Sequence, residues 1–200
     1  MKILIVAATD MELTPFKRCL MRYTKVGFAL CGVGAVATAY NLSQLRLRES
    51  DYQMVVNVGI AGTYSPVMAL GQTVAVRRER FDNFGIENAR GDINPFAGFD
   101  LYCPHLGDYD LLQGLPQVEG LTVNMLTERK ATVEQRRATF DADIETMEGA
   151  AFFYVCLREK IPFIELRGIS NLVGVRDKTQ WQTVLALENL MKVVKQLADA

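Results

Sequence analysis

Apolar and polar segments alternate along the chain in the order expected of an α/β protein. Apolar runs at residues 3–8 and 54–58 are typical of strands buried on both faces, and residues 162–169 also predict a buried strand. Weaker runs predict further strands at residues 27–31, 73–80 and 121–126, the second of them more exposed. Apolar residues at helical spacing predict helices at 11–21, 35–48, 132–138, 147–160 and from 181 to the C-terminus. This order predicts one domain over residues 1–200, with a central mixed, largely parallel β-sheet flanked by helices.

Glycine and polar residues gather where the predicted strands end. In open α/β sheets, ligands bind at the carboxyl ends of the strands. Here those ends carry residues 10–12, 32–34, 59–62 and 170–171, so we expect these four segments to converge on one cleft. Residues 81–116 are rich in Gly, Pro, Asp and Asn, which predicts a long excursion that serves as a lid or a partner contact.

Composition narrows the class of protein. Lys and Arg number 22 against 23 Asp and Glu, and this balance argues against a nucleic-acid partner. Charges interrupt every apolar run before it could span a membrane. The four cysteines show no CxxC spacing and read as reduced thiols, which predicts a cytoplasmic protein. The sequence has one histidine, and its His, Cys and Asp residues lack the spacing of metal ligands. We therefore expect no metal and no cofactor.

Three polar residues are candidates for chemistry. Glu12 follows the first predicted strand, where it would act as a base or only balance a helix dipole. Glu148 opens the most apolar helix, so its carboxylate needs donors such as the hydroxyls of a bound sugar. Asn171 ends a buried strand and would bind a ligand or cap a turn. The sequence CGVGAVA at 31–37 also fits a GxGxxA turn, so a nucleotide-binding oxidoreductase is one alternative.

Several segments together resemble the purine nucleoside phosphorylase and nucleosidase superfamily over nearly the whole chain. They are the opening strand with Glu12, GVGAVATA, NVGIAGTYSP, ETMEGAAF and RGISN. The resemblance implies a central mixed sheet flanked by helices, a purine nucleoside substrate and a homo-oligomer. By the same resemblance, Glu12 takes the position of the general base, and Met147 and Glu148 take the position of the pair that holds the ribose.

Within the superfamily the chain is most similar to the hydrolytic branch, which includes methylthioadenosine/S-adenosylhomocysteine nucleosidase and futalosine hydrolase. Asn171 stands where the methylthioadenosine enzymes place a catalytic aspartate, and Ile60 stands where they have a serine. Residues 80–88 (RFDNFGIEN), 169–181 and the short chain look like futalosine hydrolase instead. That enzyme removes hypoxanthine from futalosine on a route to menaquinone.

Two residues beyond Asn171 are candidates for the carboxylate-bearing tail of futalosine. Arg176 could bind a carboxylate bidentately and Trp181 could stack on an aromatic ring, or both could serve the loop alone. The leading hypothesis is hydrolysis of futalosine with Glu12 and Asn171 as catalytic residues. The alternatives are a methylthioadenosine-type nucleosidase, a purine nucleoside phosphorylase and a catalytically silent nucleoside binder.

Overall fold

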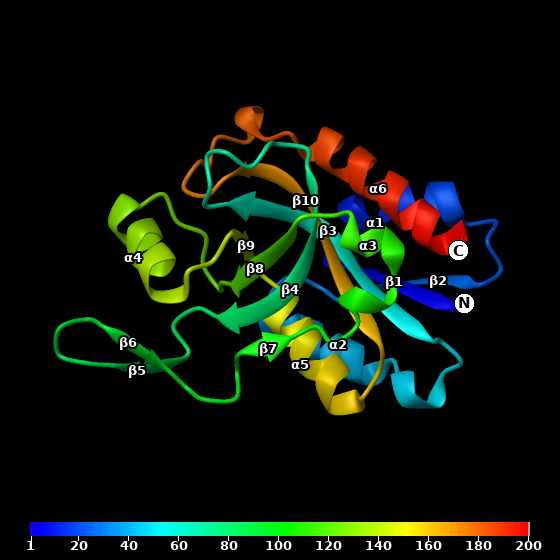
Figure 1. Ribbon diagram of the computed structural model, residues 1–200, viewed down its shortest axis with the longest axis horizontal. Coiled ribbons are helices and arrows are strands. Elements are labelled where there is room, and N and C mark those ends of the chain that lie inside the picture. The colour runs from blue at the N-terminus through cyan, green and yellow to red at the C-terminus, as the bar shows by residue number, and fades with distance from the viewer. Residues whose placement is uncertain (200) are drawn as a thin grey trace.

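A mixed β-sheet lies between layers of helices in the computed structural model, which describes residues 1–199 (Figure 1). The strands are β1 (Ile3–Ala7), β2 (Val26–Leu30), β3 (Met54–Thr63), β4 (Thr73–Phe81), β5 (Gly85–Glu87), β6 (Ile93–Pro95), β7 (Leu101–Tyr102), β8 (Gln117–Thr122), β9 (Ile144–Thr146) and β10 (Phe163–Leu172). The helices are α1 (Asp10–Leu20), α2 (Ala35–Gln44), α3 (Asp110–Gln113), α4 (Lys130–Phe140), α5 (Gly149–Glu159) and α6 (Thr183–Asp199).

The sheet is built around β3. This strand pairs in parallel with β1 and β10 and antiparallel with β9, and β1 carries β2 at the open edge. From β10 the sheet continues antiparallel to β4, then in parallel to β8 and β9, and so returns to β3. Parallel pairs outnumber antiparallel pairs, which confirms the predicted mixed, largely parallel sheet of an α/β domain.

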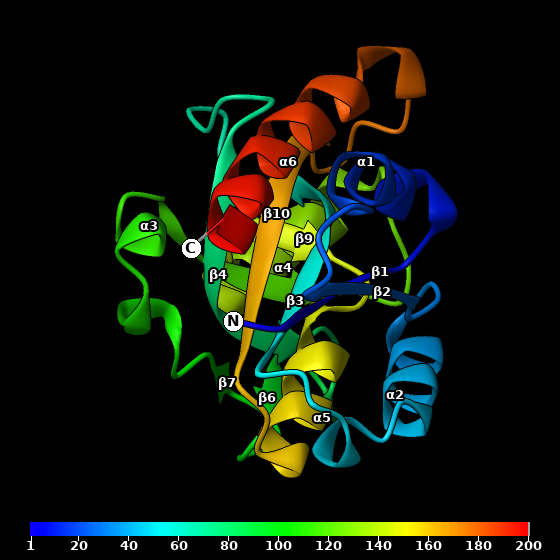
Figure 2. The same ribbon diagram turned by 90° about the vertical axis from the view of Figure 1, so that its right-hand side faces the viewer.

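Two pairs of helices cover the sheet from opposite sides, as Figure 2 shows. Phe16 of α1 and Leu190 of α6 join one buried cluster, and Leu42 of α2 and Phe153 of α5 join the other. Every residue of β1 is buried, because the strand lies between two neighbours and beneath helices on both faces. The predicted alternation of strands and helices therefore packs as helix, sheet and helix layers.

Two boundaries differ from the sequence-based expectation at the place where strands end. The strand predicted at residues 54–58 was expected to end before residues 59–62, but β3 continues through them to Thr63 because β10 pairs with it on one side and β9 on the other. The strand expected at 121–126 lies earlier, at Gln117–Thr122, where it pairs with β4. The three-residue β9 was not predicted, since so short a segment has no periodicity to detect.

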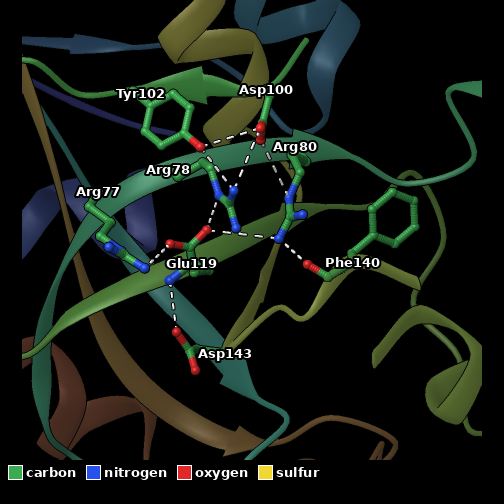
Figure 3. A network of polar contacts seen from close by, with 8 residues as sticks. All are labelled: Arg77, Arg78, Arg80, Asp100, Tyr102, Glu119, Phe140 and Asp143. Atoms are coloured by element: carbon green, nitrogen blue, oxygen red, sulfur yellow. Dashed lines mark hydrogen bonds and ion pairs between the residues drawn. The ribbon is translucent and has the colours of Figure 1, made fainter. Parts of the chain in front are cut away.

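The strand at residues 73–80 was expected to be more exposed than the others, which would place its three arginines in solvent, and this was wrong. Only Arg77 has a largely exposed side chain, whereas those of Arg78 and Arg80 are 19% and 17% exposed. All three form ion pairs with Glu119 of the neighbouring β8 (Figure 3). The Arg80 guanidinium also donates to the Phe140 carbonyl at the end of α4. Because β4 lies inside the sheet, its arginines connect it to the neighbouring strand β8 and to the end of α4.

The predicted excursion between β4 and β8 contains a small hairpin. Strands β5 and β6 pair with each other and project from the body of the molecule (Figure 1). Phe84 and Phe96 pack edge to face at the base of this hairpin, with ring centroids 5.4 Å apart, and both remain partly exposed. The hairpin has its own aromatic contacts and does not extend the main sheet.

Gly168 fixes how closely α6 approaches β10. A Cβ atom at this position would lie 2.5 Å from the Ala186 carbonyl oxygen, which belongs to the α6 backbone and cannot rotate away. Gly168→Ala is expected to lower the free energy of unfolding by about 1–3 kcal/mol, as overpacking does. Denaturant unfolding measures this. Gly107→Ala, where a Cβ would meet nothing within 4 Å, is the control, and an equal loss in both variants would contradict the close approach.

Candidate active site

A cavity of about 200 Å³ opens where β1, β3 and β10 end and α5 begins. It is lined by at least one residue from each of the four segments expected to converge, including Val33 from the glycine turn. All seven residues singled out from the sequence line it: Glu12, Ile60, Met147, Glu148, Asn171, Arg176 and Trp181. No residue of the 81–116 excursion is among its lining residues, so within one chain the excursion is not its lid.

Glu12 is fixed by two elements. As the third residue of α1 it completes a capping box, in which Glu12 Oε2 accepts from Thr9 N at 3.2 Å and from Thr9 Oγ1 at 2.8 Å. Its Oε1 accepts from the Ile60 backbone N–H of β3 at 3.1 Å. The side chain is buried but reaches the cavity. The carboxylate thus bridges the start of α1 and the centre of the sheet.

Glu148 lines the same cavity as Glu12 and lies directly before α5. Its Oε1 accepts from the Gly34 N–H at 2.9 Å, and Gly34 has φ +86°, a conformation that glycine adopts without strain. Burial raises the pKa of Glu148; the Arg167 guanidinium and the Gly34 N–H oppose that rise, whereas Glu12 adds to it. The glycine turn therefore holds a carboxylate, and the dinucleotide function considered for it has no support in this geometry.

Arg167 supplies a buried positive charge that the sequence analysis did not assign to the site. It lies in β10 with 1% of its surface exposed, and its Nε donates to Glu165 Oε1 at 2.8 Å. Burial by itself lowers the pKa of Arg167, but the carboxylates of Glu165, Glu148 and Glu12 raise it above its ordinary value. A Cβ atom at Gly59 would lie 2.3 Å from Arg167 Nη1 and 2.7 Å from Glu12 Oε1. The absence of a side chain there lets the two groups approach.

Asn171 lies beside an irregularity in β10. The register between β10 and β3 shifts between Ile169 and Asn171, and such bulges often redirect side chains next to active sites. Ser170 Oγ donates to Asn171 Oδ1 at 2.7 Å, and Asn171 Nδ2 donates to the Leu172 carbonyl at 2.9 Å. These bonds leave one N–H and one oxygen lone pair of the amide for a ligand.

Arg176 and Trp181 form one wall of the cavity. The guanidinium carbon of Arg176 lies 5.4 Å from the centre of the Trp181 ring, and Trp181 Nε1 donates to the Val175 carbonyl at 2.9 Å. The indole therefore supports the loop and also presents the arginine, so the two roles weighed from the sequence are compatible.

The lining of the cavity also includes Leu126 and Thr127, for which the sequence carried no clear signal. Their loop is held by the buried Arg136, which donates to the Met125 carbonyl at 3.0 Å and to Glu145 Oε2 at 3.1 Å.

The sequence did contain a signal for two other residues that were missed, Glu165 and Arg167. They are the charged residues of an otherwise apolar strand, and their spacing of two places them on the same face.

The assembled groups suit a polar organic ligand. One carboxylate can accept a proton, a second can accept hydrogen bonds from a diol, and an amide can read the edge of a heterocycle. Among residues 1–199 no three His, Cys, Asp or Glu side chains are arranged to hold a metal ion. In the same part of the chain, no helix has the length and apolar character needed to span a bilayer.

Comparison with known proteins identifies the family. The model of the phosphorylase superfamily matches residues 13–200. The chain belongs to the phosphorylase superfamily. This confirms the resemblance that the sequence motifs indicated.

Relatives of this superfamily member include two kinds of nucleosidase. Futalosine hydrolase of Thermus thermophilus is 31% identical over 176 residues, covering 83% of this chain and 78% of that protein. Futalosine hydrolase of Streptomyces coelicolor is 30% identical, covering 84% and 76%. The 5'-methylthioadenosine/S-adenosylhomocysteine nucleosidase of Colwellia psychrerythraea is 30% identical, covering 72% and 65%. These relatives support membership in a nucleosidase family.

Solved structures show the same fold. The native futalosine hydrolase of Helicobacter pylori has a TM-score of 0.85 at 16% identity, and the alignment covers 100% of this chain and 97% of that one. The methylthioadenosine/S-adenosylhomocysteine nucleosidase of Helicobacter pylori also has a TM-score of 0.85 at 16% identity, with coverage of 100% and 98%. The α/β fold of the superfamily is therefore shared over the whole chain.

Burial of Glu148 is expected to make the fold less stable at neutral pH. The pKa of Glu148 is raised in the folded protein, which means that its ionised form is less favourable there than in the unfolded chain. At a pH above this raised pKa, the charge of Glu148 therefore lowers the free energy of unfolding. Glu148→Gln should raise the free energy of unfolding near pH 7, and the gain should vanish once the pH falls below the ordinary pKa of glutamate. Denaturant unfolding at neutral and acidic pH measures this. A gain that is the same at both pH values would contradict it.

Proposed function

We propose that the protein hydrolyses the N-glycosidic bond of futalosine and releases hypoxanthine and dehypoxanthine futalosine. The observation that carries the proposal is the meeting of Glu12, Glu148 and Asn171 at one cavity with Arg176 at its wall. Its futalosine hydrolase and methylthioadenosine/S-adenosylhomocysteine nucleosidase relatives support cleavage of a nucleoside. The amide and the arginine favour a 6-oxopurine with an acidic tail.

Glu12 acts as the general base. Water attacks C1′ of the ribose, the C1′–N9 bond breaks, and Glu12 takes the proton that the water loses. The departing purine then takes up a proton, which restores the balance of charge. Since Glu12 keeps contacts to Thr9 and Ile60 through both oxygens, it is oriented before substrate enters. Such a base contributes about 10²–10⁴-fold to the rate.

Glu148 binds the ribose. One of its oxygens is held by the Gly34 N–H, and the other is left to accept hydrogen bonds from the 2′- and 3′-hydroxyls. A carboxylate in this place also favours the positive charge that develops on the sugar as the bond breaks. Met147, the preceding residue, lines the same cavity and offers an apolar surface beneath the sugar ring.

Asn171 sets the preference for the base. Its free N–H can donate to the 6-oxo group of hypoxanthine, while its Oδ1 accepts from N7–H. An asparagine cannot transfer a proton to N7 as an aspartic acid can. The substrate therefore needs a purine that leaves without such help, and a 6-oxopurine stabilises negative charge better than adenine does.

Arg176 and Trp181 bind the tail of the substrate. The guanidinium can pair bidentately with a carboxylate, and the indole beneath it offers an aromatic face. Ile60 lines the cavity where the methylthioadenosine enzymes have a serine, so this side of the site is apolar.

Hydrolysis is favoured over phosphorolysis because the strand ends at residues 32–34 and 59–62 carry no arginine that could hold a phosphate ion. Arg167 is buried, is paired with Glu165 and does not line the cavity. A second candidate is cleavage of methylthioadenosine or S-adenosylhomocysteine, which the relatives of that name support. The Asn171 amide would have to turn over to accept from the 6-amino group of adenine.

A panel of nucleosides tests the proposal directly. Futalosine, inosine, methylthioadenosine and S-adenosylhomocysteine are incubated separately with the protein in phosphate-free buffer, and the released bases are separated by chromatography. Hypoxanthine from futalosine should form fastest, and added phosphate should not accelerate it. Glu12→Gln, which keeps the shape but accepts no proton, should be slower by about 10²-fold or more. Faster release of adenine, or a requirement for phosphate, would overturn the assignment.

Asn171→Asp should move the preference toward adenine. A protonated aspartate donates to N7 and its other oxygen accepts from a 6-amino group, whereas against hypoxanthine it leaves two acceptors facing each other. Such an unmatched buried contact costs about 1–3 kcal/mol, or roughly 5- to 150-fold in kcat/KM. The variant is given futalosine and its 6-amino counterpart in one reaction, and both free bases are quantified. An unchanged ratio would show that Asn171 only caps the strand.

A further inference from the structure

A group of buried carboxyl side chains continues from the cavity into the middle of the sheet. Glu12 and Glu148 face the cavity, and Arg167 lies behind them. Behind Arg167 lie Glu165 of β10 and Glu79 of β4, both with 0% of their surface exposed. Neither of these last two lines the cavity, and the reaction described above uses neither.

Glu165 has the contacts of an ionised group. Its Oε1 accepts from Arg167 Nε at 2.8 Å, and its Oε2 accepts from Asn57 Nδ2 at 3.3 Å. A guanidinium at this distance stabilises a carboxylate strongly in a buried environment. The same bond fixes the position of Arg167, because it holds the guanidinium at the end of the side chain.

Glu79 lies beside Glu165 and, among the described residues, has no cation as a hydrogen-bond partner. It accepts from Thr122 Oγ1 at 2.8 Å and from Thr146 Oγ1 at 3.2 Å. A Cβ atom at Gly149 would lie 2.2 Å from Glu79 Oε1 and 2.9 Å from Glu165 Oε1, so the two carboxyl groups flank the same glycine. Burial raises the pKa of Glu79 well above its ordinary value and the neighbouring Glu165 raises it further, although the two hydroxyls and Arg167 oppose the rise.

We propose that Glu165 is a positioning residue, ionised at neutral pH, that holds Arg167 beneath Glu12 and Glu148 and balances its charge, while Glu79 beside it stays protonated. The proposal rests on the proposed function for the role of Glu12 and Glu148. Without the Glu165 charge, the positive charge of Arg167 would act on Glu12, Glu148 and Glu79 without a paired carboxylate to offset it. Glu12 and Glu148 would then bind protons less tightly, and Glu12 would be a weaker base.

Glu145 and Arg176 line the cavity together with Glu12 and Glu148. The other titratable groups near Arg167 and Glu165 are thiols. Cys31 lies near Arg167, and Cys103 and Cys156 lie near Glu165. Burial raises the pKa of Cys31 and of Cys103 to about 11 and raises that of Cys156 further. All three stay neutral across the range in which the enzyme would be assayed, so the carboxyl groups and Arg167 set the charge beneath the cavity.

The pH dependence of kcat/KM distinguishes Glu165 from Glu79. It is measured on whichever nucleoside of the panel the wild type cleaves. Glu165→Gln should move the acidic limb to lower pH by about one unit, the shift expected from one uncompensated nearby charge, and should lower the plateau. Glu79→Gln, matched in size and burial, should leave the profile unchanged because it replaces a group that is already neutral. An unmoved limb in Glu165→Gln, or an equal shift in Glu79→Gln, would overturn the proposal.

Glu165→Asp covers the case in which the glutamine variant does not fold. It keeps the charge but withdraws it from Arg167, so the acidic limb should stay in place while the plateau falls. A plateau equal to that of the wild type would show that the position of Glu165 does not matter.

Carbon-13 NMR of the glutamate carboxyl groups tests the protonation states without any substrate. The signal that Glu79→Gln removes should keep the chemical shift of a protonated carboxyl at neutral pH, and a carboxylate shift would contradict the proposal. If the wild type cleaves no nucleoside, the proposed function fails and the positioning role with it. The spectrum still decides the state of Glu79.

Discussion

The buried guanidinium of Arg167 is the constraint on which the site depends. Two carboxylates that face a cavity would repel each other and resist burial, and Arg167 lies where it stabilises both. Arg167 belongs to β10, which pairs with β3 along its length, so the backbone that carries this guanidinium is fixed inside the sheet. Two glycines make this arrangement possible. Gly59 leaves room for Arg167 and Glu12, and the Gly34 N–H donates a hydrogen bond to Glu148.

The fold serves this arrangement by bringing strand ends together. Parallel strands β1, β3 and β10 end at the same edge of the sheet, and α1 and α5 begin there. Each helix start delivers one carboxylate, Glu12 in the first turn of α1 and Glu148 directly before α5. Asn171, beside the bulge in β10, places its side-chain amide at the same edge. A ligand at this edge would meet the carboxylates of Glu12 and Glu148 and the amide of Asn171 at once.

Much of this could be predicted from the sequence, because each predicted element has a strong local pattern. The run at residues 3–8 and the polar Glu12 after it specify a buried strand and a helix start that the structure also has. Arg167 was missed because its importance depends on carboxylates far away in the chain, Glu12 and Glu148. The strand at residues 117–122 was misplaced for a related reason, since pairing with β4 and not its own pattern sets its limits.

Specificity in this account comes from a few neutral or singly charged contacts on a shared scaffold. By the resemblance in sequence, Asn171 stands where the methylthioadenosine enzymes have an acid and Ile60 stands where they have a serine, and we propose that these positions and Arg176 set the specificity. The solved structures of both kinds of nucleosidase share the fold of this chain.

A crystal structure of Glu12→Gln with futalosine bound tests the central claim most directly. The account predicts that the purine edge lies against the Asn171 amide, that the ribose hydroxyls contact Glu148, and that the carboxylate tail lies beside Arg176. A nucleoside bound outside the cavity, or a ribose turned away from Glu148, would contradict it.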